Sequence, residues 1–423
     1  MITTSLLLFI AQDPAPDRLA RLEAELSALR QEFAVSREAD RARYETQIAA
    51  LAADLEDARR GRDGSSAASR FQWGGYGEQH YNDLDGHGGA QIDIHRFVLY
   101  MGYSFSENVQ LHSETEIEHG FVEDDNGEIA IEQLWTDFRV SPTTHIQVGR
   151  VLAPLGIVNL RHEPPSFNGV ERPSVETFVL PSTWSIDALG VSGEITTSLR
   201  YQLYLSGGMD GTGFSAFEGI RGGRQEERPS AHQPAVSGRL DFFPLDSLGG
   251  DASEQSLRLG LSGLYGGLDN GNQGSDPGVD ADLLIAAVDA EYSIGRLDLR
   301  GVAAFEKIGG ASELSTVTGE SISKEIVGWY VEAAWHWMPE SWKSGEHGWA
   351  DAIAFARYDD IDTQRDVPSG FVADAHGDRD EWTLGIGLYP LENLVLKADY
   401  QIRNDEATGS PQNQFNLGIG WSF

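Results

Sequence analysis

The chain contains no cysteine, few lysines and no long apolar segment, and each absence excludes a class of protein. With no cysteine among 423 residues, disulfides, thiolate nucleophiles and cysteine-ligated metals are excluded. No run of about 18 apolar residues occurs, which excludes a membrane-spanning helix. The sequence also has no G-x-S-x-G, no H-E-x-x-H and no phosphate-binding glycine loop, so we expect no enzyme. The formal net charge of -35 opposes nucleic-acid binding.

The first 70 residues differ in composition from the rest of the chain. Residues 1–16 have a short apolar core followed by polar and proline-rich positions, which indicates a signal peptide and a short linker. Residues 17–62 are rich in Ala, Glu, Arg and Leu, and apolar residues recur at steps of three and four, which predicts a helical coiled coil. That helix either self-associates or lies along the remainder of its own chain. Residues 63–70 are predicted to form a flexible hinge.

Negative charge is concentrated in the region after the hinge. Residues 71–423 hold 54 of the 66 acidic residues but only 21 of the 31 basic ones, a net charge of about -33. The same region is rich in glycine and aromatic residues, which is typical of an all-β protein with many turns.

Alternating apolar and polar residues predict sixteen strands after residue 70. The predicted strands are 71–82, 91–105, 108–121, 129–141, 145–152, 187–196, 199–208, 235–243, 255–267, 283–294, 296–307, 326–337, 351–360, 380–389, 393–403 and 414–423. Because an up-and-down barrel with both ends on one side needs an even number of strands, we predict a 16-stranded antiparallel transmembrane β-barrel over residues 71–423.

The lengths of the connections support a membrane barrel. Connections after even-numbered strands are mostly tight, as in "SEN", "PTT" and "TS", whereas those after odd-numbered strands are mostly longer and acidic. One end of tight turns and one end of long loops is typical of outer-membrane barrels. An exported soluble β-sandwich, the alternative fold, gives no reason for so regular a pattern.

Three stretches resemble a known group of proteins. They are "FQWGGYGEQHYNDLD" at 71, "HRFVLYMGYSFSENVQLHSETEIEH" at 95 and "QVGRVLAPLGIVNLRHEPPSFNGVERP" at 147. They resemble bacterial outer-membrane porins related to the phosphate-selective (O/P-type) porins, many of which carry an N-terminal coiled coil. The terminal Phe423, after alternating apolar residues, is similar to the insertion signal of such barrels.

The resemblance implies a trimeric diffusion channel in the outer membrane of a Gram-negative bacterium, with the stalk of residues 17–62 in the periplasm. It does not transfer phosphate selectivity, because that property depends on basic residues in the channel and only four lysines are present. The negative charge predicts cation preference unless an arginine cluster reverses the potential at the constriction, so the selectivity stays open.

The longest motif-rich loop, residues 153–186, is the expected constriction, because the third external loop of general porins folds inward. We predict that the selectivity residues are Arg150, Arg161, His162, Glu163, Glu171 and Arg172. Opposed acidic and basic groups would set up a transverse field in the channel. Alternatively, Arg161, Glu163 and Arg172 pair with one another and hold the loop in place.

Strand alternation also identifies side chains that face the lumen. A charge near the middle of the bilayer costs about 2–4 kcal/mol, so charged strand residues belong inside the barrel. The predicted lumen-facing residues are His112, Glu114, Glu116, Glu118, Trp135, Asp137 and Arg139.

Two functions remain open on these observations. The first is a porin for passive diffusion of small hydrophilic solutes or ions. The second is a structural outer-membrane anchor whose coiled coil binds the cell wall or a periplasmic partner. No cofactor and no metal site are expected, apart from weak calcium or magnesium binding at the acidic external loops, where such ions would bridge to lipopolysaccharide.

Overall fold

The computed structural model describes most of the chain after residue 69. The described residues are 70–85, 89–120, 127–224, 231–245, 255–269, 279–343, 350–405, 407 and 412–423. The predicted signal peptide, the coiled coil of residues 17–62 and nearly all of the hinge lie outside them.

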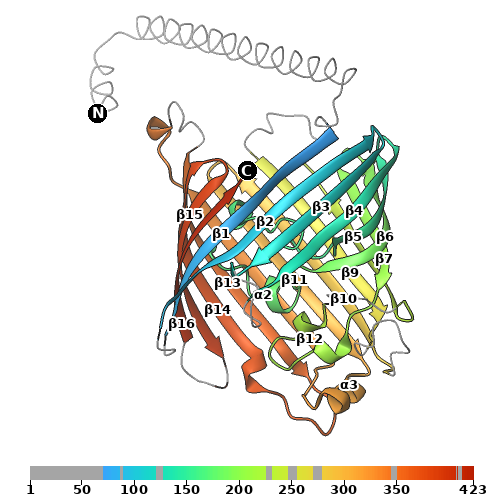
Figure 1. Cartoon of the computed structure of the whole chain (residues 1–423). Coiled ribbons are helices and arrows are strands. Elements are labelled where there is room, and N and C mark those ends of the chain that lie inside the picture. Colours follow the sequence, from blue (N-terminus) through green and yellow to red (C-terminus); the bar gives the residue numbers. More distant parts are fainter. Residues whose placement is uncertain are drawn as a thin grey trace, which may run out of the picture. The chain divides into compact units, whose positions relative to one another are not determined.

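The predicted antiparallel barrel of sixteen strands is confirmed (Figure 1). Each strand pairs with its sequence neighbours, and β1 pairs with β16 to close the barrel. The strands are β1 Phe71–Leu84, β2 Gln91–Ser106, β3 Val109–Glu118, β4 Ile129–Ser141, β5 Thr144–Leu152, β6 Ser185–Thr196, β7 Leu199–Gly207, β8 Pro234–Phe242, β9 Gln255–Gly267, β10 Asp282–Ile294, β11 Leu297–Gly309, β12 Glu325–His336, β13 Asp351–Asp366, β14 Asp378–Leu391, β15 Leu394–Asp405 and β16 Gln412–Ser422.

As predicted, tight turns follow β2, β4, β6, β10 and β14 at one end of the barrel. The connections after β8 and β12, residues 243–254 and 337–350, are longer exceptions at that end. The long connections contain the short helices α2 Val175–Phe178 and α3 Ala311–Thr318. They also contain 3-10 turns at Pro164–Ser166 (η2), Gly211–Gly213 (η3), Arg221–Gly223 (η4) and Ala375–Gly377 (η8). No helix among the described residues is long and apolar enough to cross a membrane.

One predicted loop is part of a strand. The acidic segment that begins at Asp359 belongs to β13, which continues to Asp366. Asp359, Ile361 and Thr363 alternate into the interior and are buried there. The predicted strand ends at residue 360 because a run of acidic residues is typical of a solvent-exposed loop, but a barrel interior also accommodates acidic side chains.

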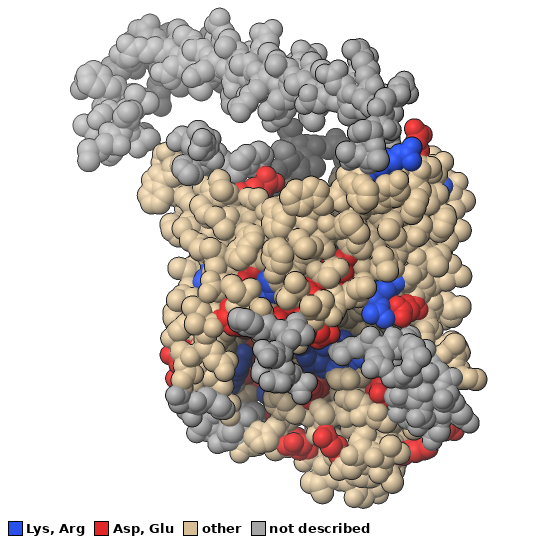
Figure 2. Space-filling model, viewed as in Figure 1, with Lys and Arg blue, Asp and Glu red and all other residues tan. Residues whose placement is uncertain are grey.

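The outer wall of the barrel is an apolar surface. Leu134, Leu189, Leu203, Leu261 and Ile386 are among many apolar side chains exposed there. Figure 2 shows one face of this wall, on which charged side chains are sparse in the upper half and gather toward the end with the long loops. So large an exposed apolar surface suits lipid and not water.

Exposed aromatic residues lie near both ends of the wall, as expected for two interfacial girdles. At the end with the tight turns they include Trp73, Phe105, Trp335 and Phe423, and at the other end they include Tyr265, Trp329, Trp382 and Phe415.

The interior of the barrel is apolar on one side. Strands β9 to β12 contribute buried residues to one cluster that also contains residues of the long connections. From the strands the cluster includes Leu264, Leu283, Ile285, Val302, Ile326 and Tyr330. Both faces of these strands are therefore apolar near the end with the long loops, and the inward face must be covered by protein.

A glycine on β5 offers a test of the register of this wall. Gly149 has φ of 129°, and a Cβ there would lie 2.2 Å from the carbonyl oxygen of Leu134 on β4. Gly149→Ala should therefore lower the free energy of unfolding by about 1–3 kcal/mol. The measurement is urea unfolding of the protein in lipid vesicles, followed by heat-modifiable gel mobility.

Gly89→Ala is the matched control for this prediction, because a Cβ at Gly89 meets nothing within 4 Å. Equal unfolding midpoints for the two variants would contradict the register of β4 and β5 described here.

Candidate functional site

The connection between β5 and β6, residues 153–184, folds into the barrel. One side of it is apolar: Leu155, Val175, Val179, Leu180 and Trp184 are buried in the cluster formed by β9 to β12. Its short elements also contact distant strands, since α2 touches β12 and β13 whereas η2 touches β1, β15 and β16. This segment, called the inner loop below, therefore crosses the lumen.

Polar side chains of the barrel wall bind the other side of the inner loop. Asp399 on β15 accepts a hydrogen bond from the backbone N–H of Val170 (2.6 Å), and Lys397 donates to the carbonyl of Gly169 (2.7 Å). On the neighbouring wall, Asn168 donates to Glu332 (2.7 Å). These groups satisfy backbone and side-chain polar atoms that have left water.

A buried glutamate braces the inner loop internally. Glu176 accepts hydrogen bonds from the backbone N–H groups of Ile157 (2.8 Å) and Val158 (2.6 Å) and from the hydroxyl of Tyr330 (2.8 Å). Burial raises the pKa of Glu176 to about 7, against the lowering effect of these donors. Gly156, at φ of 66°, leaves room for the carboxylate, because a Cβ there would lie 2.6 Å from it.

The inner loop leaves a cavity of about 600 Å³ between itself and the strands β1, β2, β15 and β16. Its charged lining consists of four arginines and two glutamates, accompanied by two histidines. These residues are Arg96, Arg172, Arg221, Arg403, Glu78, Glu171, His80 and His95.

The four arginines differ in how far they are neutralised. Arg96 contacts Glu78 (2.7 Å) and Glu116 (3.0 Å), and Arg403 contacts Glu381 (3.0 Å). Arg172 and Arg221 instead donate to the hydroxyl of Ser182 (3.2 Å) and the carbonyl of Thr177 (3.1 Å). Within the described ranges, neither has a carboxylate within ion-pair distance.

Burial and neighbouring positive charge act on both of these arginines. Burial and the charge of Arg224 lower the pKa of Arg221 to about 10, and burial and the charge of Arg96 lower the pKa of Arg172. The lowered pKa values mean that burial and neighbouring positive charge outweigh the stabilisation that nearby carboxylates give to these two guanidinium groups.

The predicted selectivity residues on the inner loop contact different walls of the barrel. Arg161 pairs with Glu291 on β10, and Glu163 accepts a hydrogen bond from Tyr100 on β2 (3.2 Å). Glu171 lies against His80 (3.3 Å) and accepts from Asn82 (2.8 Å). Arg161 and Arg172 do not pair with Glu163, since Arg172 donates to Ser182. The alternative in which mutual ion pairs of these three residues hold the loop therefore does not describe their contacts.

His162 lies in the interior between two carboxylates. Its Nε2 is 3.4 Å from Glu114 on β3 and 3.7 Å from Glu132 on β4, and all three side chains are buried. Burial lowers the pKa of His162, but these two carboxylates outweigh it and raise the pKa to about 10.

The structure corrects the placement of Arg150. This residue is paired in register with Leu134, which is exposed on the outer wall, and it follows the outward-facing Ile146 and Val148. Its guanidinium forms a two-pronged ion pair with Asp187 on β6 (2.8 and 3.0 Å). Arg150 therefore faces outward, although its position next to the loop in sequence predicts a place at the constriction.

The strand residues predicted for the lumen occupy two levels of the interior. Toward the long loops, Glu116 and Glu118 lie against Arg96 (3.0 and 3.6 Å). Toward the tight turns, the ring of His112 stacks on that of Trp135 (4.3 Å), and Asp137 pairs with His145 (2.7 Å). Arg139 is opposite His145 in the register and is exposed.

The sequence analysis does not predict several of the residues at these sites, chiefly Arg96, Glu132 and Arg221. The first two occur where a β-bulge interrupts the alternation, in β2 opposite Glu78 and in β4 opposite Glu114. The sequence signal was present, since both "HR" and "EQ" place two polar residues side by side between outward apolar ones. Arg221 lies in the connection between β7 and β8, which has no motif that predicts a contact with the inner loop.

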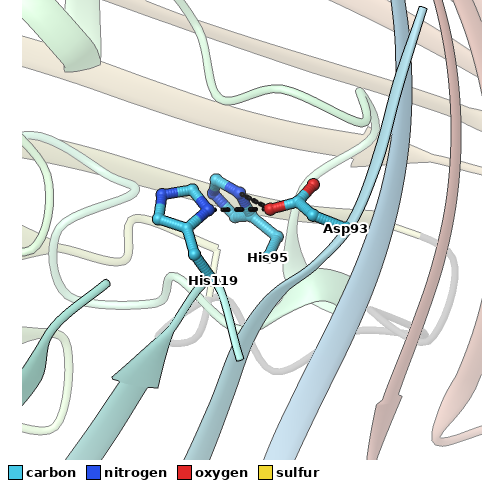
Figure 3. A group of neighbouring side chains, drawn as sticks. All are labelled: Asp93, His95 and His119. Atoms are coloured by element: carbon cyan, nitrogen blue, oxygen red, sulfur yellow. Dashed lines mark hydrogen bonds and ion pairs between the residues drawn. The ribbon is translucent and has the colours of Figure 1, made fainter. Parts of the chain in front are cut away.

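Two groups of described side chains could hold a metal ion. One is Glu114, Glu132 and His162. The other is Asp93, His95 and His119, and Figure 3 shows both histidine rings directed at the same carboxylate oxygen of Asp93. In this second group the Asp93–His119 contact is a hydrogen bond of 2.7 Å, and Arg96 donates to Nε2 of His95 (2.9 Å). Calcium or magnesium binding at the acidic external loops stays a prediction, since residues 121–126 and 270–278 lie outside the described residues.

Comparisons with known proteins give one sequence relative and a shared fold. No family model matches the chain. An uncharacterized protein of Aquifex aeolicus (strain VF5) is 31% identical over 365 residues, which cover 83% of this chain and 79% of that protein.

Solved structures of outer-membrane proteins share the architecture. The channel DcaP of Acinetobacter baumannii has a TM-score of 0.53 at 11% identity, covering 84% of this chain and 97% of that one. The anion-selective porin from Comamonas acidovorans has a TM-score of 0.51 at 12% identity, with 84% and 99% covered. The trimer form of OmpT from Vibrio cholerae has a TM-score of 0.51 at 10% identity, with the same coverage as the Comamonas porin. At such low identity these likenesses establish the fold alone.

A disulfide can test the position of the inner loop. A Cβ built on Gly418 of β16 would lie 3.6 Å from the Cβ of Val170, within the range of about 3.5–4.5 Å for disulfides. Because the chain has no other cysteine, Val170→Cys with Gly418→Cys should form one intramolecular cross-link under mild oxidation. Non-reducing electrophoresis of the heat-denatured protein should show faster migration that a reductant reverses.

The control for this prediction combines Val170→Cys with Gly295→Cys, because Gly295 is in the turn between β10 and β11 and a Cβ there meets nothing within 4 Å. Cross-linking of both pairs to the same extent, or of neither, would contradict an inner loop seated against β16.

Proposed function

Because the chain belongs to the same family as the uncharacterized Aquifex aeolicus protein and forms a closed sixteen-stranded barrel, we propose that it is a porin of a Gram-negative outer membrane. The observation that supports this most directly is the inner loop, which enters the barrel and leaves a charged cavity beside it. The apolar outer wall with its aromatic girdles suits a bilayer, and the charged interior suits hydrophilic solutes.

In this proposal the inner loop narrows the channel, and solutes pass between it and the wall formed by β1, β2, β15 and β16. Arg172 on the inner loop and Arg221 on the next long connection favour anions at this point, because they lack carboxylate partners within the described residues. Glu78 and Glu171 line the same cavity and contact His80 (3.1 and 3.3 Å). The resulting unequal distribution of charge would also orient dipolar solutes.

A local preference for anions is compatible with the negative charge of the whole barrel. Ion flow responds to the potential at the narrowest part of the path, within about a Debye length of 8–10 Å at physiological salt. Many carboxylates elsewhere in the interior are neutralised by arginines, for example Glu332 by Arg300 (3.1 Å) and Asp359 by Arg357 (2.8 Å). The acidic residues of the external loops act farther away and through water.

We also propose that the barrel assembles as a trimer. The outward-facing pair of Arg150 and Asp187 lies on β5 and β6, where exposure to lipid would be unfavourable. A contact between subunits at these strands would remove the pair from lipid. The similarly folded OmpT of Vibrio cholerae has been solved in a trimer form. Residues 17–62, which lie outside the described residues, would then form a periplasmic stalk.

The proposal predicts the ion preference of the channel and its origin. The protein in a planar bilayer should conduct in steps of three, and its reversal potential in a potassium chloride gradient should indicate anion preference. Arg172→Gln with Arg221→Gln should lower the anion-to-cation permeability ratio roughly 3- to 10-fold, because a change of about one kT in local potential acts oppositely on the two ions.

Arg150→Gln is the matched control, since it removes an arginine from the outer wall and should leave the reversal potential unchanged. Cation preference in the unaltered protein would overturn the role given to Arg172 and Arg221. Folded protein in the bilayer without any conductance would exclude the porin and favour the structural anchor.

A further inference from the structure

The cluster of Glu114, Glu132 and His162 joins the inner loop to the barrel wall deep in the interior. Glu114 is on β3 and Glu132 is on β4, whereas His162 belongs to the inner loop. Each of the three side chains is at most 5% exposed. Any species held between them would fix the inner loop to this wall.

The ring of His162 is oriented as in a metal ligand. Its Nδ1–H donates to the backbone carbonyl of Asn159 (3.1 Å), so a neutral ring directs the lone pair of Nε2 toward the two carboxylates. Metal-ligating histidines usually donate their other ring N–H to a carbonyl or a carboxylate in this way. The Asn159 side chain is itself held, because it donates to the carbonyl of Ala153 (2.8 Å) and accepts from the N–H of Trp184 (2.8 Å).

The two carboxylates are also arranged toward a shared point. The β-bulge in β4 turns Glu132 and Gln133 inward together, and Gln133 donates to one oxygen of Glu114. The other oxygen of Glu114 faces His162. Oε2 of Glu132, which also faces His162, is buried and has no hydrogen-bond partner. A buried polar atom in that state indicates a missing proton donor or a missing ion.

Glu114 and Glu132 differ in their partners from the acidic residues beside them on the same wall. Arg96 contacts Glu78, Glu116 and Glu118. Within the described residues, Glu114 and Glu132 have no arginine or lysine within 4 Å, and His162 is the group that faces both.

The spacing of the ligand atoms fits a transition-metal ion. Ligand atoms on a tetrahedral zinc ion with bonds of about 2.0–2.1 Å lie about 3.3 Å apart. The Nε2 of His162 is 3.4 Å from the oxygen of Glu114 and 3.7 Å from that of Glu132. In the group of Asp93, His95 and His119, by contrast, the contact of 2.7 Å is shorter than the separation of two ligand atoms on one tetrahedral zinc ion.

We propose that Glu114, Glu132 and His162 bind a divalent zinc-type ion that clamps the inner loop to β3 and β4. One histidine nitrogen and two carboxylate oxygens supply three ligands, and water completes the coordination. The ion takes the place of the proton that would otherwise lie between His162 and the carboxylates. This site does not depend on transport, so it can be tested whether or not the barrel conducts.

The test uses the full chain purified in detergent, stripped with a chelator and then incubated with zinc chloride at neutral pH. After removal of loosely bound metal, the unaltered protein should retain one zinc per chain, and zinc should raise its midpoint of thermal unfolding. Glu132→Gln and His162→Gln should each lose the retained zinc and the thermal shift. Heat-modifiable gel mobility shows whether each variant has folded.

The matched control is Asp93→Asn with His119→Gln, which disrupts the other histidine-containing group and should retain the zinc. Equal zinc retention by the unaltered protein and Glu132→Gln would overturn the proposal, as would an unaltered protein that retains none. If the variants do not fold, the visible absorption spectrum of the unaltered protein loaded with cobalt in place of zinc tests the site. An intense visible spectrum of tetrahedral cobalt supports the site, and a spectrum of hydrated cobalt overturns it.

Discussion

The interior of this barrel is organised by one constraint: the inner loop has left water, so its polar groups need partners and its apolar groups need cover. The wall meets both needs on different sides. Strands β9 to β12 present apolar residues to Leu155, Val179 and Leu180. On the opposite side, Asp399 and Lys397 bind the backbone of the loop at Val170 and Gly169. Charged residues inside the barrel therefore form hydrogen bonds with the inner loop, in addition to lining the water-filled space.

This constraint explains which parts of the structure the sequence could predict. Alternation located all sixteen strands, because a strand between lipid and any interior needs one apolar face. Alternation does not predict whether water or a protein loop covers the inward face of a strand. Leu283 and Ile285 are buried under the loops, whereas Leu284 between them is exposed on the outer wall. A continuous apolar run such as "LLIAAV" thus predicts a strand with two apolar faces. It does not identify the loop that covers the inward face, because that loop lies far away in sequence.

The candidate site was predicted less completely, for reasons that differ between residues. The sequence points to His162 and Glu171 because the inner loop is rich in charge and proline. Arg150 was misplaced because nearness in sequence was given more weight than the alternation of Ile146 and Val148. Glu132 was missed because a bulge shifts the face of every residue beyond it. Two adjacent polar residues inside an otherwise alternating strand therefore indicate a β-bulge.

The two bulges have a combined effect on the interior. One bulge brings Arg96 inward on β2, and the other brings Glu132 inward on β4. Between them on β3, Glu116 contacts Arg96 and Glu114 contacts His162. Regular strands would have turned one residue of each polar pair toward lipid, where a charge costs about 2–4 kcal/mol near the midplane. The bulges instead concentrate charge on one interior wall, next to the segment of the inner loop that contains His162. Contact with that wall fixes the segment around His162, while the cavity lies beside Glu171 and Arg172. The position of the inner loop and the potential in the cavity thus arise from the same local irregularities of the sheet.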